Sequence, residues 1–161
     1  MAPESDMPTV VKVDDVWQIE GKPRERFEIR AMYHPPNLPG KTIVVGYINI
    51  PPNGGTPSHR HGGAAVIAIP VSGYSLNQMN GQEPKIYGPG DFLYEAPGCH
   101  HQRSDNPGEE NAIFFAVLVV DDEVINGGKD LGQLVVLDKE VETGERKPSK
   151  CVGKYENPCC E

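Results

Sequence analysis

Glycine and proline interrupt the apolar runs of this chain before any of them reaches the length of a typical helix. The 161 residues include 18 Gly and 16 Pro, and these residues separate runs such as Thr42–Ile50 and Ala112–Val120. Both residue types end strands and build turns. No segment keeps a helical period of 3.6 over a dozen positions. The pattern therefore predicts an all-β protein of eight or so short antiparallel strands.

The strand-like runs extend from Phe27 to Leu137. At roughly 150 residues per domain, this length predicts a single domain. Antiparallel sheets of short strands must hide their edges, which favours a sandwich or a closed jelly-roll barrel. We expect residues 1–26 to form an N-terminal arm, residues 27–137 the β-barrel, and residues 138–161 an extended C-terminal tail.

The net charge of the chain and the length of its apolar runs argue against nucleic acids and membranes as partners. The net charge is −8, so there is no surplus of cations to neutralise nucleic-acid phosphates. The first residues lack the basic start and apolar stretch of a signal peptide, and no apolar run is long enough to cross a bilayer. The four cysteines show neither zinc-ribbon spacing nor a paired framework. We therefore expect a cytoplasmic protein with no nucleic-acid or membrane partner.

Four of the five histidines fall in two groups about 40 residues apart. His59 and His61 are two residues apart, so in a strand both side chains point to the same face and can share one metal ion. A third nitrogen ligand has to come from His100 or His101, which form the second group. Three histidines of this kind hold a divalent ion such as Fe, Zn, Mn or Ni. The alternative is a pair of histidines on an exposed strand that binds nothing.

The segments around these histidines resemble the two sequence motifs of the cupin family. The first motif, a Gly, His-x-His and a closing Gly, is similar to PPNGGTPSHRH (Pro51–His61) followed by PVSG (Pro70–Gly73). The second, Gly-Asp, a Pro-x-Gly turn and a His, is similar to GPGDFLYEAPGCHH (Gly88–His101). The resemblance covers roughly Lys41–Val120. It implies a compact single-domain (type-2) cupin, with a jelly-roll β-barrel, a metal site inside it and a homodimeric assembly.

The resemblance also implies which histidine completes the site. Setting Gly98 on the glycine of the second motif puts His101 at the ligand position and turns His100 outward by alternation. It leaves Ala96 where the family has a proline, so the register is imperfect. The implied metal ligands are therefore His59, His61 and His101.

One family residue is missing. The metal-binding Glu of the first motif should lie near position 65, where this chain has Ala64, Ala65 and Val66. Three neutral imidazoles would leave the ion its full charge, which favours an anionic and bidentate substrate. In the alternative, the site has lost its metal and the small apolar residues widen a dry pocket for an apolar ligand. Glu95 could replace the missing ligand, but we expect it to be an ordinary exposed carboxylate.

Two polar residues are candidates for contact with a substrate. Arg103 lies two residues after His101, on the same face if the strand is regular, and Gln78 lies on the strand that follows Gly73. We predict catalytic roles for Arg103 and Gln78. The alternative for Arg103 is a solvated cation at the barrel rim, paired with Asp105 or Glu109.

These features predict a small metal-dependent enzyme that acts on an anionic small organic molecule. The candidates are a carboxylate, a phenolate or an enolate, including polyketide-like molecules. An oxidoreductase of dioxygenase type is the first expectation, because the resembled family is rich in oxygen chemistry. A metal-assisted lyase or isomerase (a decarboxylase, dehydratase or cyclase) is the second, and a non-catalytic small-molecule-binding barrel without metal is the third. No nucleotide-binding fingerprint is present.

Overall fold

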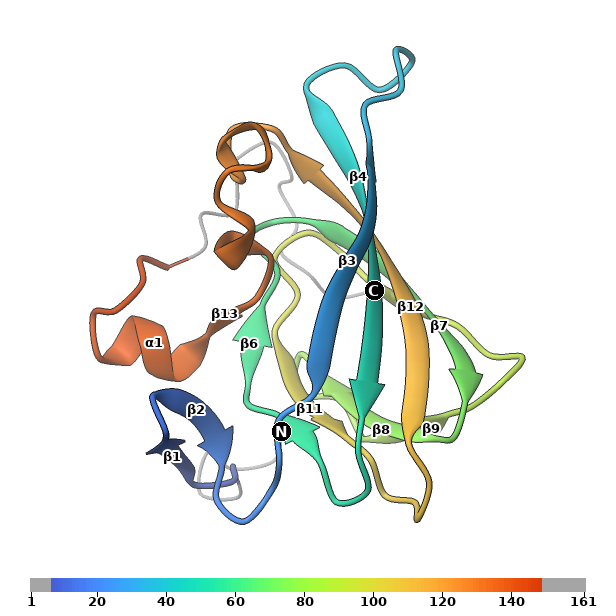
Figure 1. The fold of residues 1–161 in the computed structure, drawn as a ribbon, viewed down its shortest axis with the longest axis vertical. Coiled ribbons are helices and arrows are strands. Elements are labelled where there is room, and N and C mark those ends of the chain that lie inside the picture. Colours follow the sequence, from blue (N-terminus) through green and yellow to red (C-terminus); the bar gives the residue numbers. More distant parts are fainter. Residues whose placement is uncertain (1–6, 149–161) are drawn as a thin grey trace.

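The computed structural model describes residues 7–148, and most of the regular structure in this range is β-strand (Figure 1). The prediction of an all-β chain is confirmed. The strands are β1 (Val10–Val13), β2 (Val16–Ile19), β3 (Arg26–Tyr33), β4 (Lys41–Ile50), β5 (Gly55–Thr56), β6 (His59–Arg60), β7 (Ala65–Ser72), β8 (Ser75–Met79), β9 (Lys85–Tyr87), β10 (Leu93–Glu95), β11 (His101–Asp105), β12 (Ala112–Asp121) and β13 (Val136–Leu137). Two short 3-10 turns, Asn126–Gly128 and Leu131–Leu134, precede β13, and the helix α1 (Asp138–Glu142) follows it.

Two antiparallel sheets form the walls of a jelly-roll β-barrel. One sheet has the order β10-β7-β12-β4-β3, and the other has the order β13-β6-β11-β8-β9, with β5 paired to β11. Figure 1 shows β3, β4, β12 and β7 side by side as one wall, with β6, β11 and β8 forming the other. The barrel prediction is therefore confirmed.

The alternation of residues along β4 and β12 explains where the core lies. In β4 every second residue is buried, and β12 pairs with it over ten residues, from Ala112 opposite Ile50 to Asp121 opposite Lys41. Because side chains alternate between the two faces of a strand, the buried set of each strand points into the barrel. The buried core is made of Val44, Ile48, Ile50, Ala64, Val66, Ala112, Ala116, Leu118, Val120, Ile125 and Leu134.

The predicted N-terminal arm begins with a tight hairpin. Asp14 and Asp15 join β1 to β2 with positive φ angles of 48° and 63°, which match the two-residue turns that suit the twist of a hairpin. Trp17 of β2 donates from Nε1 to Oε1 of Glu145 at 3.1 Å, and Ile19 is buried. The hairpin thus packs on the rest of the chain through both the barrel and the segment after α1.

The segment after β12 returns to the barrel instead of leaving it. β13 pairs with β6, placing Val136 opposite Arg60 and Leu137 opposite His59. Residues 138–142 then form helix α1, where the sequence analysis expects an extended tail. Residues 149–161, including Cys159 and Cys160, lie outside the described part of the chain. Within residues 7–148, no helix has the length and apolar character needed to cross a bilayer.

Candidate metal centre

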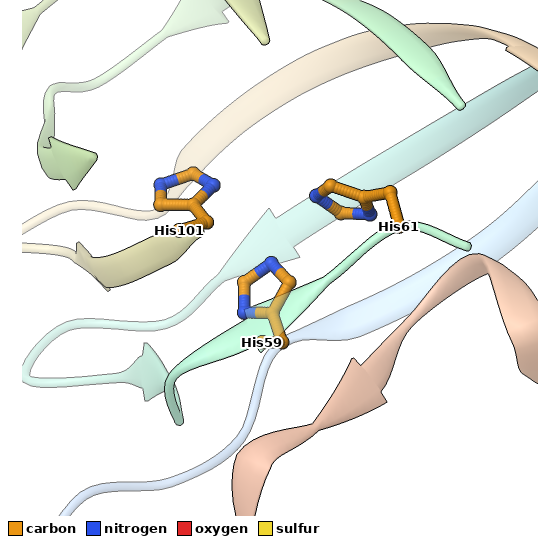
Figure 2. A group of neighbouring side chains, drawn as sticks. All are labelled: His59, His61 and His101. Carbon is orange, nitrogen blue, oxygen red and sulfur yellow. The ribbon is translucent and has the colours of Figure 1, made fainter. Parts of the chain in front are cut away.

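Three histidines converge inside the barrel, on the sheet that contains β6 and β11 (Figure 2). His59 begins β6, His61 follows that strand directly, and His101 begins β11. The pairing of β11 with β6 places His101 opposite His59, so two segments far apart in sequence meet at this point. One ring nitrogen from each residue lies within 4.8 Å of the other two. The structure thus brings together the three ligands that the sequence resemblance implies.

Each of these rings is held from behind by a hydrogen bond. A carbonyl oxygen can only accept, so the ring nitrogen that contacts it carries the proton and the other nitrogen keeps a free lone pair. In all three rings this second nitrogen faces the cluster. The three bonds are His59 Nδ1 to Pro57 O (2.7 Å), His61 Nδ1 to Leu134 O (2.7 Å) and His101 Nε2 to Asn77 Oδ1 (2.9 Å). Such outer partners fix the tautomer and the ring orientation of metal-binding histidines.

Glu95 closes the fourth side of the cluster. Its side chain is only 3% exposed, with Oε2 lying 3.1 Å from His61 Nε2 and Oε1 lying 3.1 Å from His101 Nδ1. The expectation of an ordinary exposed carboxylate is therefore wrong. The alternation in β10 carries the missed signal, because the buried apolar Leu93 is two residues away and shares its face with Glu95.

The protonation of this cluster is shifted by burial and by charge. Burial, followed by the charges of His61 and His101, holds the pKa of His59 well below its usual value. Burial also lowers the pKa of His61, but the charge of Glu95 outweighs it, and the net pKa is raised. For Glu95, burial favours a higher pKa, but His101 and His61 outweigh it and hold this pKa well below the usual value. Glu95 is therefore an ionised carboxylate inside the barrel.

The donor atoms of the cluster fit a divalent metal ion. His61 Nε2, His101 Nδ1 and Glu95 Oε2 are buried and have no hydrogen-bond partner, although each nitrogen is 3.1 Å from a Glu95 oxygen. Buried polar atoms without partners are rare in proteins, and a single cation would satisfy all of these. Imidazole nitrogens together with a carboxylate suit Fe, Zn, Mn or Ni.

A small cavity lies against the cluster. Its volume is about 50 Å³, which is room for roughly four water molecules. Val66, one of the residues at the expected position of the family Glu, contributes to its apolar wall. The other apolar lining residues are Phe27, Ile48, Ala68, Phe114, Ala116, Leu118 and Val135. Beside the cluster itself, Glu25, Thr56 and Ser104 add polar groups.

Glu25 is a second carboxylate at this cavity, with a side chain that is only 7% exposed, and it was not predicted from the sequence. Two Arg24 nitrogens donate to its oxygens at 2.8 and 2.9 Å, and Thr56 Oγ1 donates at 2.8 Å. It precedes β3 in the segment that the sequence assigns to an arm, where nothing in the residue pattern marks a site.

The two predicted catalytic residues do not line this cavity. Arg103 donates from Nε and Nη2 to Asp105 Oδ2 at 3.1 and 2.6 Å, which is the rim pairing considered as its alternative. Gln78 is buried and donates to a backbone carbonyl at 3.0 Å. A β-bulge between His101 and Arg103 breaks the alternation, so Ser104 faces the cavity in place of Arg103. Catalytic roles for Arg103 and Gln78 stay predictions, without a contact that supports them.

His100 lies outside the cluster, as the register predicts. Its Nε2 is 2.7 Å from Ser58 Oγ and 2.7 Å from Oδ2 of Asp138, the first residue of α1. Ser58 Oγ also donates to Asp138 Oδ2, at 2.8 Å. Burial would raise the pKa of Asp138, but the hydrogen bonds from His100 and Ser58 outweigh it and lower this pKa. His100 therefore fastens the helix to the barrel beside the metal centre.

Comparison with known proteins identifies a family for the central part of the chain. Residues 46–120, from within β4 to Val120 of β12, match the Cupin_2 family model, described as a cupin domain. No curated protein gives a significant match to the sequence.

Several solved structures are similar to this chain. A cupin domain from Bordetella pertussis Tohama I is 19% identical, over 62% of this chain and 96% of that chain, with a TM-score of 0.49. A Cupin 2 conserved barrel domain protein from Salinispora arenicola CNS-205 is 23% identical, over 64% and 81%, with a TM-score of 0.46. The oxalate decarboxylase of Lactobacillus farciminis, in a formate complex, is 20% identical, over 49% and 26%, with a TM-score of 0.44. The first two are matched over most of their length and the decarboxylase over about a quarter.

The family match covers the strands that carry the whole histidine cluster and Glu95. Together with β3 and β13, the matched strands form the two facing sheets of a jelly-roll barrel. Residues 46–120 of this chain form a cupin domain.

Proposed function

We propose that this cupin is a metal-dependent enzyme that acts on a small anionic organic molecule, with oxidoreductase chemistry of dioxygenase type as the first candidate. The observation that carries the proposal is the set of three histidines, two buried and one half-buried, whose lone pairs converge beside a cavity. His59, His61 and His101 would hold the ion. A divalent ion there supplies Lewis acidity and, if it is redox-active, electrons for oxygen chemistry.

The residues of the cavity support an anionic and compact substrate. With Glu95 at the cluster, a divalent ion keeps a net charge of about +1, so an anion is still attracted. The apolar side chains of Phe27, Phe114 and Leu118 lower the local dielectric constant, which strengthens that attraction. A volume of about 50 Å³ favours a small carboxylate or enolate over a phenolate or a polyketide-like molecule.

The experiment that tests the proposal begins with the metal. Protein purified without an affinity tag or added metal is analysed for elements, next to the His59→Ala variant. We expect about one ion per chain in the native protein and a loss of that ion in the variant. Protein reloaded with Fe(II) should then consume O₂ when a small carboxylate or enolate from a panel is added. A native protein without a bound ion, which also takes up none when metal is supplied, would contradict the proposal.

A second candidate, a metal-assisted lyase or isomerase, is favoured by one observation. A divalent ion held by the three histidines beside the cavity would act as a Lewis acid on a bound carbonyl or carboxylate group, and this chemistry needs no redox-active metal. Turnover of the same panel under argon distinguishes the two candidates, because a lyase or isomerase needs no O₂. Binding of apolar compounds by a metal-free protein would instead support the non-catalytic barrel.

We also propose that a second copy of the chain covers the outer face of the β10-β7-β12-β4-β3 sheet. This outer sheet face consists of Ile67, Ile69, Val71, Tyr94 and Phe115, which are all large, apolar and between 36% and 51% exposed. Strand pairing places Tyr94 beside Ile67 and Ile69 beside Phe115, so the face is continuous. These side chains present roughly 400 Å² of apolar surface, about half of what one partner contributes to a standard interface. Half-buried neighbours on β4 and β12 extend it.

A further inference from the structure

We infer that Glu95 is the fourth protein ligand of the metal centre, so that β10 supplies the carboxylate that the sequence lacks near position 65. This inference rests on the proposed metal site and goes beyond its three histidines. It concerns which atoms of this chain hold the ion.

Glu95 approaches the rings of His61 and His101 from the side that faces the cluster. Its oxygens lie next to His61 Nε2 and His101 Nδ1, the nitrogens that carry free lone pairs. The opposite nitrogens already donate to Leu134 O and to Asn77 Oδ1. Glu95 therefore does not support the rings from behind. It lies on the side where the ion would be.

The distances from the Glu95 oxygens to the two ring nitrogens match those between neighbouring ligands of one metal ion. Both nitrogen–oxygen separations between Glu95 and the rings are 3.1 Å, and neither is a hydrogen bond. Two neighbouring ligands of an octahedral ion at about 2.1–2.2 Å are separated by about 3.0–3.1 Å. A carboxylate oxygen and a nitrogen lone pair repel each other at this distance unless a positive charge lies between them. One cation removes both repulsions at once.

The register of the sheet places Glu95 beside the position expected for the family carboxylate. β10 pairs with β7, and Glu95 lies directly opposite Val66. The position expected for the family carboxylate, near residue 65, is thus on the strand adjacent to Glu95 and at the same level of the barrel. A side chain from β10 can therefore reach the place that Ala65 and Val66 cannot serve.

The negative charge of the buried Glu95 side chain also requires a positive partner. The Glu95 side chain is 3% exposed, and a buried carboxylate needs a positive partner. Within residues 7–148, the ion pairs of Glu95 are with His61 and His101, and none is with Lys or Arg. Those two histidines must be neutral at the inner nitrogen to bind a metal. In the loaded protein the ion itself is then the partner of the carboxylate.

The test compares native protein with Glu95→Gln, which keeps the shape of the side chain and removes its charge. Glu25→Gln is the matched control, because Glu25 is a carboxylate of the same cavity whose hydrogen bonds are to Arg24 and Thr56 and not to the three histidines. Zn(II) affinity is measured by competition with a chelator, and the visible absorption of the Co(II)-loaded protein reports its ligands. We expect Glu95→Gln to bind Zn(II) about 100-fold more weakly and to change the Co(II) spectrum. Glu25→Gln should stay within about threefold of native affinity, with an unchanged spectrum.

The outcomes separate this inference from the proposed function. Native Co(II) and Zn(II) binding with an unchanged spectrum in Glu95→Gln would overturn the inference and leave the three-histidine site standing. A native protein that binds neither metal would overturn both. If circular dichroism shows that Glu95→Gln does not fold, Glu95→Asp takes its place: a shorter carboxylate should shift the Co(II) spectrum, and an unshifted spectrum counts against Glu95 as a ligand.

Discussion

His100 and His101 are adjacent in the chain and lie in different surroundings. His101 is buried and directs Nδ1 at the cluster, while the His100 ring contacts Ser58 and Asp138 on the outer side. His100 lies directly before β11 and His101 is the first residue of that strand, so at the scale of single residues their side chains point to opposite sides of an extended segment. This difference also makes the pair a direct test of which histidine binds the ion.

We predict that His101→Ala lowers the metal content from about one ion per chain to nearly none. His100→Ala should keep its metal, because His100 offers no atom to the cluster. It should instead loosen the attachment of α1, at a cost of about 1 kcal/mol for the lost hydrogen bonds. Elemental analysis measures the first effect and thermal unfolding the second. Equal metal loss in both variants would show that the assigned register is wrong.

Metal uptake should weaken as the pH falls. The pKa of His61 is raised, so the proton that competes with the metal already binds there at a pH above the ordinary histidine value of about 6.5. Above this raised pKa the ring is neutral and binds the ion, and below it the metal must displace a proton. We expect the Zn(II) dissociation constant to rise up to about tenfold per pH unit between pH 8 and 6. The measurement is a chelator competition series, and a constant affinity over that range would contradict the prediction.

At the scale of elements, the strand pattern and the histidine pair could be predicted from the sequence. Gly and Pro mark the strand ends, and the spacing of His59 and His61 places them on one face. The burial of Glu95 was accessible from its alternation with Leu93, but an exposed carboxylate was expected. The direction of the Arg103 side chain could not be predicted from the sequence. The bulge after His101 reverses the alternation, and no residue type near it indicates a bulge.

The Leu134 carbonyl also could not be predicted from the sequence. It is a backbone atom, 73 residues away from the His61 side chain that it positions. Only the path of the chain after β12 brings the two together. A backbone acceptor of this kind cannot be recognised from the identity of its side chain. Glu25 was not predicted either, because its segment was expected to be part of an N-terminal arm.

Gly62 links the strand that holds the histidines to the segment that holds Leu134. Its φ is +63°, and an added Cβ would lie 2.5 Å from Gln133 O and 3.1 Å from Val124 Cγ1. We predict that Gly62→Ala destabilises the protein by about 1–3 kcal/mol and weakens metal binding, because the backbone that positions His61 must move. Gly40→Ala is the control, since its φ is +74° and nothing lies near an added Cβ. It should lower the melting temperature without changing the Zn(II) affinity. Equal Zn(II) affinity in both variants would contradict the proposed link.

At the scale of the whole molecule, the outer sheet face is the feature that calls for a partner. The largest apolar patch on a monomer typically measures about 300–600 Å² and is often functional, so this face of roughly 400 Å² is a candidate contact surface. We predict that Ile67→Glu converts a dimer into a monomer, because it places a charge at the centre of the face. Ile86→Glu on β9 is the control, since Ile86 is 59% exposed on the opposite sheet. Light scattering after size-exclusion chromatography gives the molar mass, and a native protein that runs as a monomer at all concentrations would contradict the proposed dimer.

The hydrogen bond between His61 and the Leu134 carbonyl sets an order of events during biosynthesis. A ribosome makes the chain from its N-terminus, so His59 and His61 emerge well before His101, and the group that orients His61 follows 73 residues after it. Until β13 has joined β6, a captured ion would meet a loosely held ligand. For the proposed metal site, this order predicts that loading follows the pairing of β13 with β6, and cells starved of metal should accumulate a folded barrel without the ion.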